Sequence, residues 1–319
     1  MHEFELIKKY FSKISSNNKF ALNLNDDVFF DKQKGLVISI DTYNEGNHFL
    51  NFKKPKFVIK KIIRSSISDL VCKGVKPKFY FISGSGNQKS FSKKNLSAIS
   101  NSLKQEQKKY NISLCGGDTT FSNKLSFSIT TVGYSKSIIY RNKAKLNDDI
   151  YVTGNLGDSF VGLQILKNKM RFKKKTNTYF INKYYHPDIQ ISLAKKLLKF
   201  ANTSIDISDG LIADLEKMLN NLNFSYQIYE DKIPISKYLS QLVMSHKFKK
   251  SKLISNGDDY QILFTASASK SRIIRETSIN LGIKITKIGE IVSATKQSSM
   301  FDQKSKQILL QNKGYIHKF

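Results

Sequence analysis

Short apolar runs typical of buried strands alternate with longer stretches of helical periodicity along most of this sequence. The runs 36–40 and 79–82 have the length and the β-branched or aromatic content of strands, and the Gly-Ser-Gly at 84–86 predicts that the second one breaks there. Between them, residues 55–72 place apolar side chains at helical spacing and begin with proline, a favoured first residue of a helix. This alternation predicts an α/β (α+β) fold of mixed sheets with helices on one face.

The chain of 319 residues is longer than one hydrophobic core usually organises, so we expect two domains. A second series of patterns begins near Leu146, with a strand at 149–153, a basic loop at 171–177 and a helix at 189–200. We therefore place the boundary between an N-terminal domain, 1–143, and a C-terminal domain, 144–319.

The net charge of +28 would suit a nucleic-acid partner, which is one hypothesis for this chain. However, only five of the 53 basic residues are arginine, and the lysines are scattered as on a solvated surface. No apolar run reaches the ~20 residues that span a bilayer, and acidic residues stand where a signal peptide needs positive charge. Cys72 and Cys115 have no metal-site or disulfide-scaffold spacing. We expect a cytoplasmic protein with neither nucleic acid nor membrane as its partner.

Aspartates mark the candidate site, because only 25 residues are acidic and several aspartates follow a predicted strand or helix beside turn residues. Each of them alone is more often a turn former or a helix cap. Brought together in one cleft, they would repel one another unless cations intervened. Oxygen ligands without a His/Cys cluster indicate Mg²⁺. The aspartates in question are Asp26, Asp27, Asp41, Asp69, Asp118, Asp206 and Asp209.

These aspartates belong to an ordered series of motifs that extends over nearly the whole chain. The series resembles the thiamine-monophosphate kinases, within the larger group that contains aminoimidazole ribonucleotide synthetase. The motifs are Asn25-Asp26-Asp27, Ser39-Ile40-Asp41-Thr42, Gly46-Asn47-His48-Phe49, Ser68-Asp69-Leu70, Gly116-Gly117-Asp118-Thr119-Thr120, Asp206-Ile207-Ser208-Asp209-Gly210-Leu211, Asn256-Gly257-Asp258-Asp259-Tyr260 and Lys313-Gly314-Tyr315.

The resemblance implies a two-domain aminoimidazole ribonucleotide synthetase-like fold in which the N-terminal domain sheets pair in a homodimer. It implies ATP-dependent phosphorylation of thiamine monophosphate to thiamine diphosphate, with several Mg²⁺ ions and an active site between the domains. Family positions for magnesium match Asp27, Ser39, Asp41, Asp69, Asp118, Asp206 and Asp209. Those for ATP match Gly117, Asp118, Arg141 and Ser208, and those for the acceptor match His48, Asp258 and Tyr315.

The residues themselves support parts of this assignment. The segment 206–210 passes from a strand to a helix start, where free N–H groups favour phosphate or its metal. Gly117 lets the backbone approach a ligand, and the planar fork of Arg141 suits phosphate. By contrast, His48 has the alternative of a loop histidine with its hydrogen bonds satisfied, and Tyr315 that of a packing residue.

The acceptor phosphate is mostly dianionic at pH 7, so the reaction needs no strong general base. We expect direct in-line transfer without a phosphoenzyme, with catalysis by positioning and electrostatics.

Three departures from the family pattern keep other hypotheses open. Asn23 and Asn25 stand where glycines are usual, Ile40 replaces a threonine, and Asp258 replaces a glutamate one methylene longer. The alternatives are an enzyme of the same group with another acceptor, an inactive homologue and the nucleic-acid-binding protein. A selenophosphate synthetase needs a reactive cysteine near the N-terminus, whereas the first cysteine here is Cys72.

Overall fold

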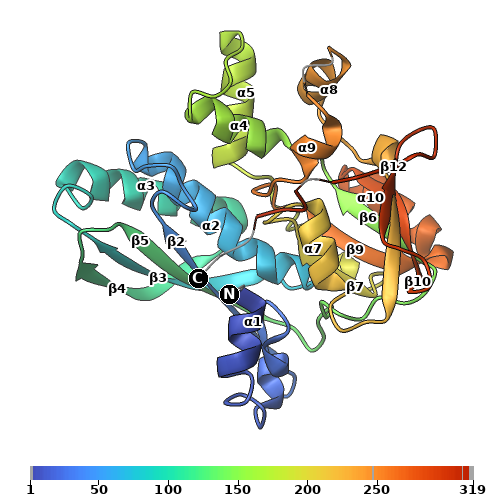
Figure 1. Ribbon diagram of the computed structural model, residues 1–319. Helices are drawn as coiled ribbons and strands as arrows, with labels where there is room; N and C mark the ends of the chain where they lie inside the picture. The colour runs from blue at the N-terminus through green and yellow to red at the C-terminus, as the bar shows by residue number, and fades with distance from the viewer. Residues whose placement is uncertain (1–2, 246–247, 311, 316–319) are drawn as a thin grey trace.

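The computed structural model describes residues 3–245, 248–310 and 312–315, and these residues form two β-sheets with helices packed against them (Figure 1). The strand order is β1-β2-β5-β3-β4 in the first sheet and β12-β11-β8-β10-β6-β9-β7 in the second. Both sheets mix parallel and antiparallel pairs. The prediction of a mixed α/β fold is therefore confirmed.

Helices α2 (Pro55–Cys72) and α3 (Lys93–Tyr110) cover one face of the first sheet (Figure 1). Val58 and Ile62 of α2 are fully buried against this face, as the helical spacing predicts. Ile40 and Phe81 lie in one row on the opposite face and are exposed. The strands are β1 (Phe29–Asp31), β2 (Leu36–Asn44), β3 (Pro77–Gly86), β4 (Ser113–Phe121) and β5 (Ser126–Tyr134).

Two edges of the first sheet are unpaired among the described residues. β4 is one edge and is exposed along its whole length. The other edge is half of β2, because β1 pairs only with residues Leu36 to Ile38. The half Ser39 to Asn44 has β5 on one side and no strand on the other.

The second sheet is flanked by α7 (Leu211–Met218) and α10 (Ser271–Leu281), while α4 (Asp158–Leu166), α5 (Lys174–Tyr185) and α8 (Lys237–Met244) form an arm beside it (Figure 1). Its core includes Ile205, Leu215 and Leu263, all buried. The shorter helices are α1 (Glu3–Leu6), α6 (Ala194–Leu197) and α9 (Lys250–Ile254). The strands are β6 (Asp148–Thr153), β7 (Thr203–Asp206), β8 (Phe224–Tyr229), β9 (Ile262–Ser267), β10 (Ile285–Ser293), β11 (Ser299–Phe301) and β12 (Gln307–Ile308).

The two halves share a core around α2. Ile63 and Ile67 of this helix belong to the same buried cluster as Leu193, Leu197 and Phe264 of the second half. The segment between β5 and β6 contains the predicted division into 1–143 and 144–319, which stays a prediction. No described helix combines the length and the apolar character that crossing a bilayer requires.

Three sequence predictions of local structure are wrong. The glycines at 84–86 do not break β3, because the strand continues in register with β4 as far as Gly86 and Phe121. The basic loop at 171–177 is partly helical, because α5 begins at Lys174 and buries Phe180 against the arm. The helix at 189–200 is reduced to α6, since Gln190 bonds to Gln261 across the fold and the backbone before α6 forms turns.

Candidate active site

A cleft of about 850 Å³ separates the two halves and is lined by side chains from both. Eleven of the thirteen residues predicted for metal, ATP or acceptor line this cleft, and the two that do not are Gly117 and Asp118. The residues that line it are Asp27, Ser39, Asp41, His48, Asp69, Arg141, Asp206, Ser208, Asp209, Asp258 and Tyr315.

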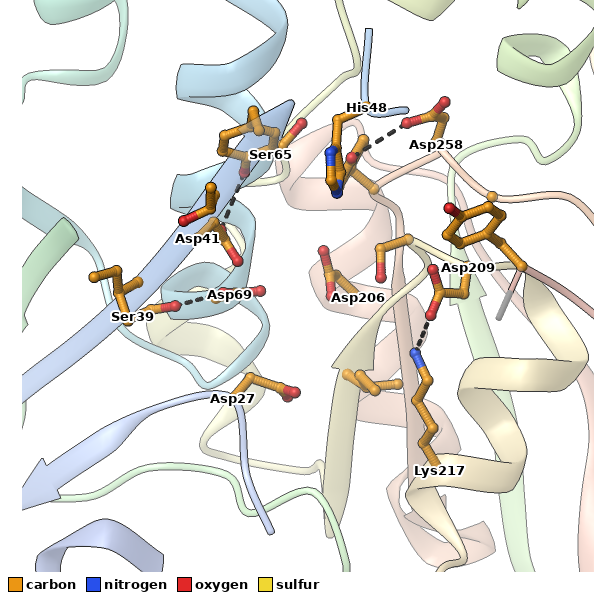
Figure 2. Close-up of a pocket in the computed structure, with 18 of the residues that line it drawn as sticks. Asp27, Ser39, Asp41, His48, Ser65, Asp69, Asp206, Asp209, Lys217 and Asp258 are labelled. Atoms are coloured by element: carbon orange, nitrogen blue, oxygen red, sulfur yellow. Dashed lines mark hydrogen bonds and ion pairs between the residues drawn. The ribbon is translucent and has the colours of Figure 1, made fainter. Parts of the chain in front are cut away.

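Three aspartates in the middle of the cleft have hydroxyl partners. Figure 2 shows Asp41 and Asp69 on one wall facing Asp206 on the other. The hydroxyl of Ser39 donates to Asp69 at 2.5 Å, and that of Tyr43 donates to Asp41 at 3.0 Å. Ser68 donates to Asp206 in the same way. β2 supplies Ser39, Asp41 and Tyr43 together because alternate residues of a strand face the same side.

Burial makes ionisation of these three carboxyl groups unfavourable. It raises the pKa of Asp41 to about 7, and the negative charge of Asp27 adds to this effect. Burial likewise raises the pKa of Asp206 to about 7, with Asp214 and Asp27 contributing. The pKa of Asp69 also lies well above its ordinary value because of burial and of the neighbouring Asp41 and Asp206. A bound cation would relieve both the desolvation and the mutual repulsion.

Asp27, in contrast, is paired with fixed positive charges. Nζ of the buried Lys73 lies 2.8 Å from Oδ1 of Asp26 and 2.8 Å from Oδ2 of Asp27. The guanidinium of Arg141 lies 2.9 Å from the other oxygen of Asp27. Burial opposes ionisation of Asp27, but Lys73 and Arg141 outweigh it and hold the pKa of Asp27 below its usual range.

Asp209 is also paired with a lysine, and here one sequence expectation is wrong. Nζ of Lys217 lies 2.5 Å from Asp209 and 2.7 Å from Asp214 (Figure 2). The N–H groups of Ser208, Asp209 and Gly210, expected to be free for phosphate, all donate to Asp214 at 3.0–3.1 Å. The reason is local, since Asp214 stands one turn inside α7 and its carboxylate reaches back to the helix start.

The predicted acceptor residues lie at one end of the cleft. His48 accepts a hydrogen bond at Nδ1 from the N–H of Asn44, 3.0 Å away, and its ring meets that of Tyr43 edge-on. The N–H of Tyr315 donates to the carbonyl of Asp209 at 2.9 Å. Asp258 is paired with the buried Lys61 at 2.7 Å.

Gly117 and Asp118 lie away from this cleft on the exposed strand β4. Gly117 stands in register with Asp41 through Ile129 and Ile82, three strand spacings or about 14 Å away. Asp118 is the next residue, so its side chain points to the opposite face of the sheet. A single chain does not bring Asp118 to the other predicted metal ligands.

Asn23, which stands where the family usually has glycine, adopts the left-handed backbone conformation that glycine favours. Asn23 has a φ of 56°, in the left-handed region that asparagine tolerates, and its neighbours Leu22 and Leu24 share this conformation. Asn25 does not, because its φ is −112°. Asn23 therefore adopts a glycine-like backbone conformation, whereas Asn25 does not.

The sequence reasoning missed the lysines that pair with the aspartates of the cleft. Lys61, Lys73 and Lys217 each contact a carboxylate that lines it. The sequence pattern that could have indicated these lysines is weak. Lys61 precedes the buried Ile62 on α2 and Lys73 follows the buried Cys72 at its end, but lysines are frequent throughout the chain.

Comparisons with known proteins agree with this geometry. Residues 24–135 match the family of AIR synthase related proteins, N-terminal domain. The thiamine-monophosphate kinase of Buchnera aphidicola from Schizaphis graminum is 35% identical over 99% of this chain and 98% of its own. That from the Acyrthosiphon pisum symbiont is 36% identical with the same coverage. The solved structure of AaThiL complexed with AMPPCP and TMP superposes with a TM-score of 0.84 at 26% identity, over 99% of this chain and 97% of that one. The chain belongs to the thiamine-monophosphate kinase family.

Proposed function

We propose that this protein transfers the γ-phosphoryl group of ATP to thiamine monophosphate and so produces thiamine diphosphate, in the cytoplasm. The observation that carries the proposal is the acidic cleft, to which both halves of the chain contribute carboxylates. A cleft of this kind suits two polyanionic reactants only together with cations. Relatives named for this activity, and a similar fold solved with AMPPCP and TMP, support the choice of reactants.

The donor set of the cleft fits Mg²⁺. Among the described residues, no three His, Cys, Asp or Glu side chains gather closely enough to enclose one ion. Mg²⁺ does not require such a cage, because it commonly binds one or two carboxylates and completes its shell with water and phosphate. Asp41, Asp69 and Asp206, whose carboxylates have no lysine partner among the described residues, are the residues that would hold it. When bound, Mg²⁺ supplies positive charge to the phosphate groups and helps to align them.

The protein's own part in the reaction is to position the reactants. Lys73 and Arg141 keep Asp27 ionised at one end of the cleft, and Lys217 forms an ion pair with Asp209. His48 and Asp258 stand at the acceptor end. The acceptor phosphate carries its own nucleophilic oxygen, so the transfer goes directly from ATP to the acceptor without a protein-bound phosphate.

Gly117 and Asp118 complete the proposed site from a second copy of the chain. The exposed edge β4 and the unpaired half of β2, Ser39 to Asn44, are complementary strand edges. A dimer in which β4 of one copy lies beside this half of β2 covers the exposed Ile40 and Phe81. It also carries Gly117 and Asp118 of one copy towards Asp41 of the other.

The direct test is an assay of the purified protein with ATP, Mg²⁺ and thiamine monophosphate, with thiamine diphosphate measured by chromatography. We expect stoichiometric formation of thiamine diphosphate and ADP, and no product in the presence of a chelator. Thiamine and other phosphate monoesters serve as comparison acceptors. ATP consumption without thiamine diphosphate would favour an enzyme of the same fold group with another acceptor.

A further inference from the structure

Lys61 is a buried cation that the proposed reaction has not used. It lies on α2, its side chain is 1% exposed, and its Nζ lies 2.7 Å from Oδ1 of Asp258. Asp258 is 25% exposed and lines the cleft near His48 (Figure 2). The ion pair therefore connects the interior of the first half with the acceptor end of the cleft.

The surroundings of Lys61 hold its ammonium group in one place. Nζ lies 3.7 Å from the centre of the Tyr184 ring of α5, which is a close cation–π contact. The hydroxyl of Tyr260 donates to the same oxygen of Asp258, Oδ1, at 3.2 Å. Within the described part of the chain, both polar contacts of this carboxylate thus fall on Oδ1, and Oδ2 is left for a ligand.

The backbone of Asp258 is fixed as well. Its φ is 70°, a left-handed conformation that costs energy in a residue with a side chain. Its N–H donates to the carbonyl of Ser208 at 2.9 Å, and a side chain at Gly257 would collide with that same carbonyl. The loop 256–260 therefore packs closely against the loop 206–210, and Lys61 holds the acidic side chain of this loop that lines the cleft.

A contribution to protein stability does not by itself explain the ion pair between Lys61 and Asp258. Removing a lysine from water is costly, and a buried ion pair is often no more stabilising than apolar side chains of similar size. Burial lowers the pKa of Lys61 against the opposing effect of Asp258. A methionine would fill the same space on α2 without this cost. What the ammonium group adds is a defined orientation and a reduced charge for Asp258.

We propose that Lys61 is a positioning residue for acceptor specificity, which holds Oδ1 of Asp258 so that Oδ2 meets the ring end of the acceptor. The inference rests on the proposed function. Thiamine monophosphate carries an amino group on its pyrimidine and a positive charge on its thiazolium. A carboxylate with one oxygen fixed by Lys61 offers the other as a single directed acceptor for such a group. Because the side chain of Asp258 is assigned to the acceptor, we expect acceptor binding to depend on this contact more strongly than ATP binding does.

The experiment compares steady-state kinetics of the wild type with K61M, D258N and the double variant K61M/D258N, with ATP and thiamine monophosphate each varied. We expect K61M to raise KM for thiamine monophosphate by about tenfold to a hundredfold, the range for losing a charge-assisted hydrogen bond, and to leave KM for ATP within about twofold. The double variant should match D258N alone, because Lys61 acts through Asp258.

A matched control removes the other buried ion pair of α2. Arg64 bonds to Glu106 at 2.8 Å, and neither residue lines the cleft. The double variant R64M/E106Q should change stability without changing either KM. If K61M alone fails to fold, the decisive comparison is between the kinetics of K61M/D258N and those of D258N. The double variant removes both charges of the ion pair together and so leaves neither one unpaired.

The outcomes separate the inference from the proposed function. An unchanged acceptor KM in K61M or D258N, a parallel rise in both KM values, or a double variant clearly worse than D258N would each overturn the role of Lys61. Failure of the wild type to form thiamine diphosphate would overturn the proposed function and this inference with it.

Discussion

Nζ of Lys73 lies 2.8 Å from Oδ2 of Asp27, so a buried ammonium group is paired with one carboxylate of the cleft, whereas Asp41 and Asp69 have no lysine partner among the described residues. Lys217 holds Asp209 in the same way on the other wall. The structure thus divides the predicted metal ligands into two groups. Asp27 and Asp209 are paired with lysines of the chain itself, whereas Asp41, Asp69 and Asp206 are the carboxylates that a bound cation would neutralise on the proposed function.

Replacing Lys73 with methionine should destabilise the protein strongly. Asp26 and Asp27 would remain buried with much of their charge uncompensated, and breaking a buried pair in this way typically costs about 3–5 kcal/mol. Mg²⁺ should restore more stability to K73M than to the wild type, since it can replace the lost charge. The measurement is urea unfolding with and without Mg²⁺. In the control R272M, which breaks an exposed pair on α10, the loss should be about 0–1 kcal/mol. If K73M and R272M lost the same free energy of unfolding, Lys73 would not be needed to compensate the charges of Asp26 and Asp27.

Stability of the metal-free protein should depend on pH through Asp41 and Asp206. The pKa of each is raised from 3.8 to about 7, so between these values the folded state binds more protons than the unfolded state. Raising the pH from about 4 to about 7 therefore removes stability. His186 acts in the opposite direction, because burial lowers its pKa to about 4.

The Asp41 contribution can be isolated by comparing wild type with D41N across this pH range in the presence of a chelator. The difference cancels the effect of His186. We expect D41N to lose less stability than the wild type as the pH rises, and saturating Mg²⁺ to reduce the wild-type loss. Parallel stability profiles for the two proteins would show that Asp41 titrates as an ordinary exposed carboxyl group.

Asp41→Asn and Asp118→Asn should each lower the rate of thiamine diphosphate formation by at least about a hundredfold, the usual cost of losing an electrostatic contact to the reacting groups. Circular dichroism should show that both variants keep the fold. D302N is the control, because Asp302 is a turn residue outside the cleft. Near-normal activity of both site variants would argue strongly against the assignment of metal ligands.

Mixing these two inactive variants tests whether Asp118 acts on a second copy. In a mixed dimer, one site receives both substitutions and the other receives neither. A random mixture should recover about a quarter of wild-type activity, because half of the dimers are mixed and each has one intact site. If Asp41 and Asp118 of the same chain worked together, every site would carry one substitution and the mixture would stay inactive.

Rapid quenching of the reaction with γ-labelled ATP should reveal label in ATP and thiamine diphosphate, with none on the protein. The acceptor phosphate attacks directly, so no side chain has to carry the phosphoryl group. Protein-bound label, trapped under either acidic or basic quenching and formed and lost at the rate of turnover, would refute this mechanism.

The sequence predicted the parts of the site that lie at the ends of regular elements. Asp206 ends β7 and Asp69 lies in the last turns of a helix of strong periodicity, so their approach follows from the order of elements, whereas Asp41 lies inside β2, which continues to Asn44. The burial of Lys61 and Lys73 could not be predicted, because it depends on Tyr184 and Asp27, which are distant in sequence. The position of Asp118 on an exposed edge depends on strand order, which a single sequence does not determine.

The carboxylate of Asp214 has a further consequence for how a nucleotide is held. Since it already accepts the N–H groups of Ser208, Asp209 and Gly210, a triphosphate finds none of these three main-chain donors free at the start of α7. On the proposed function, ATP is then held at this wall by electrostatic attraction to Mg²⁺ ions that are taken up from solution. Nucleotide occupancy would follow the free magnesium level of the cell and fall when that level is depleted.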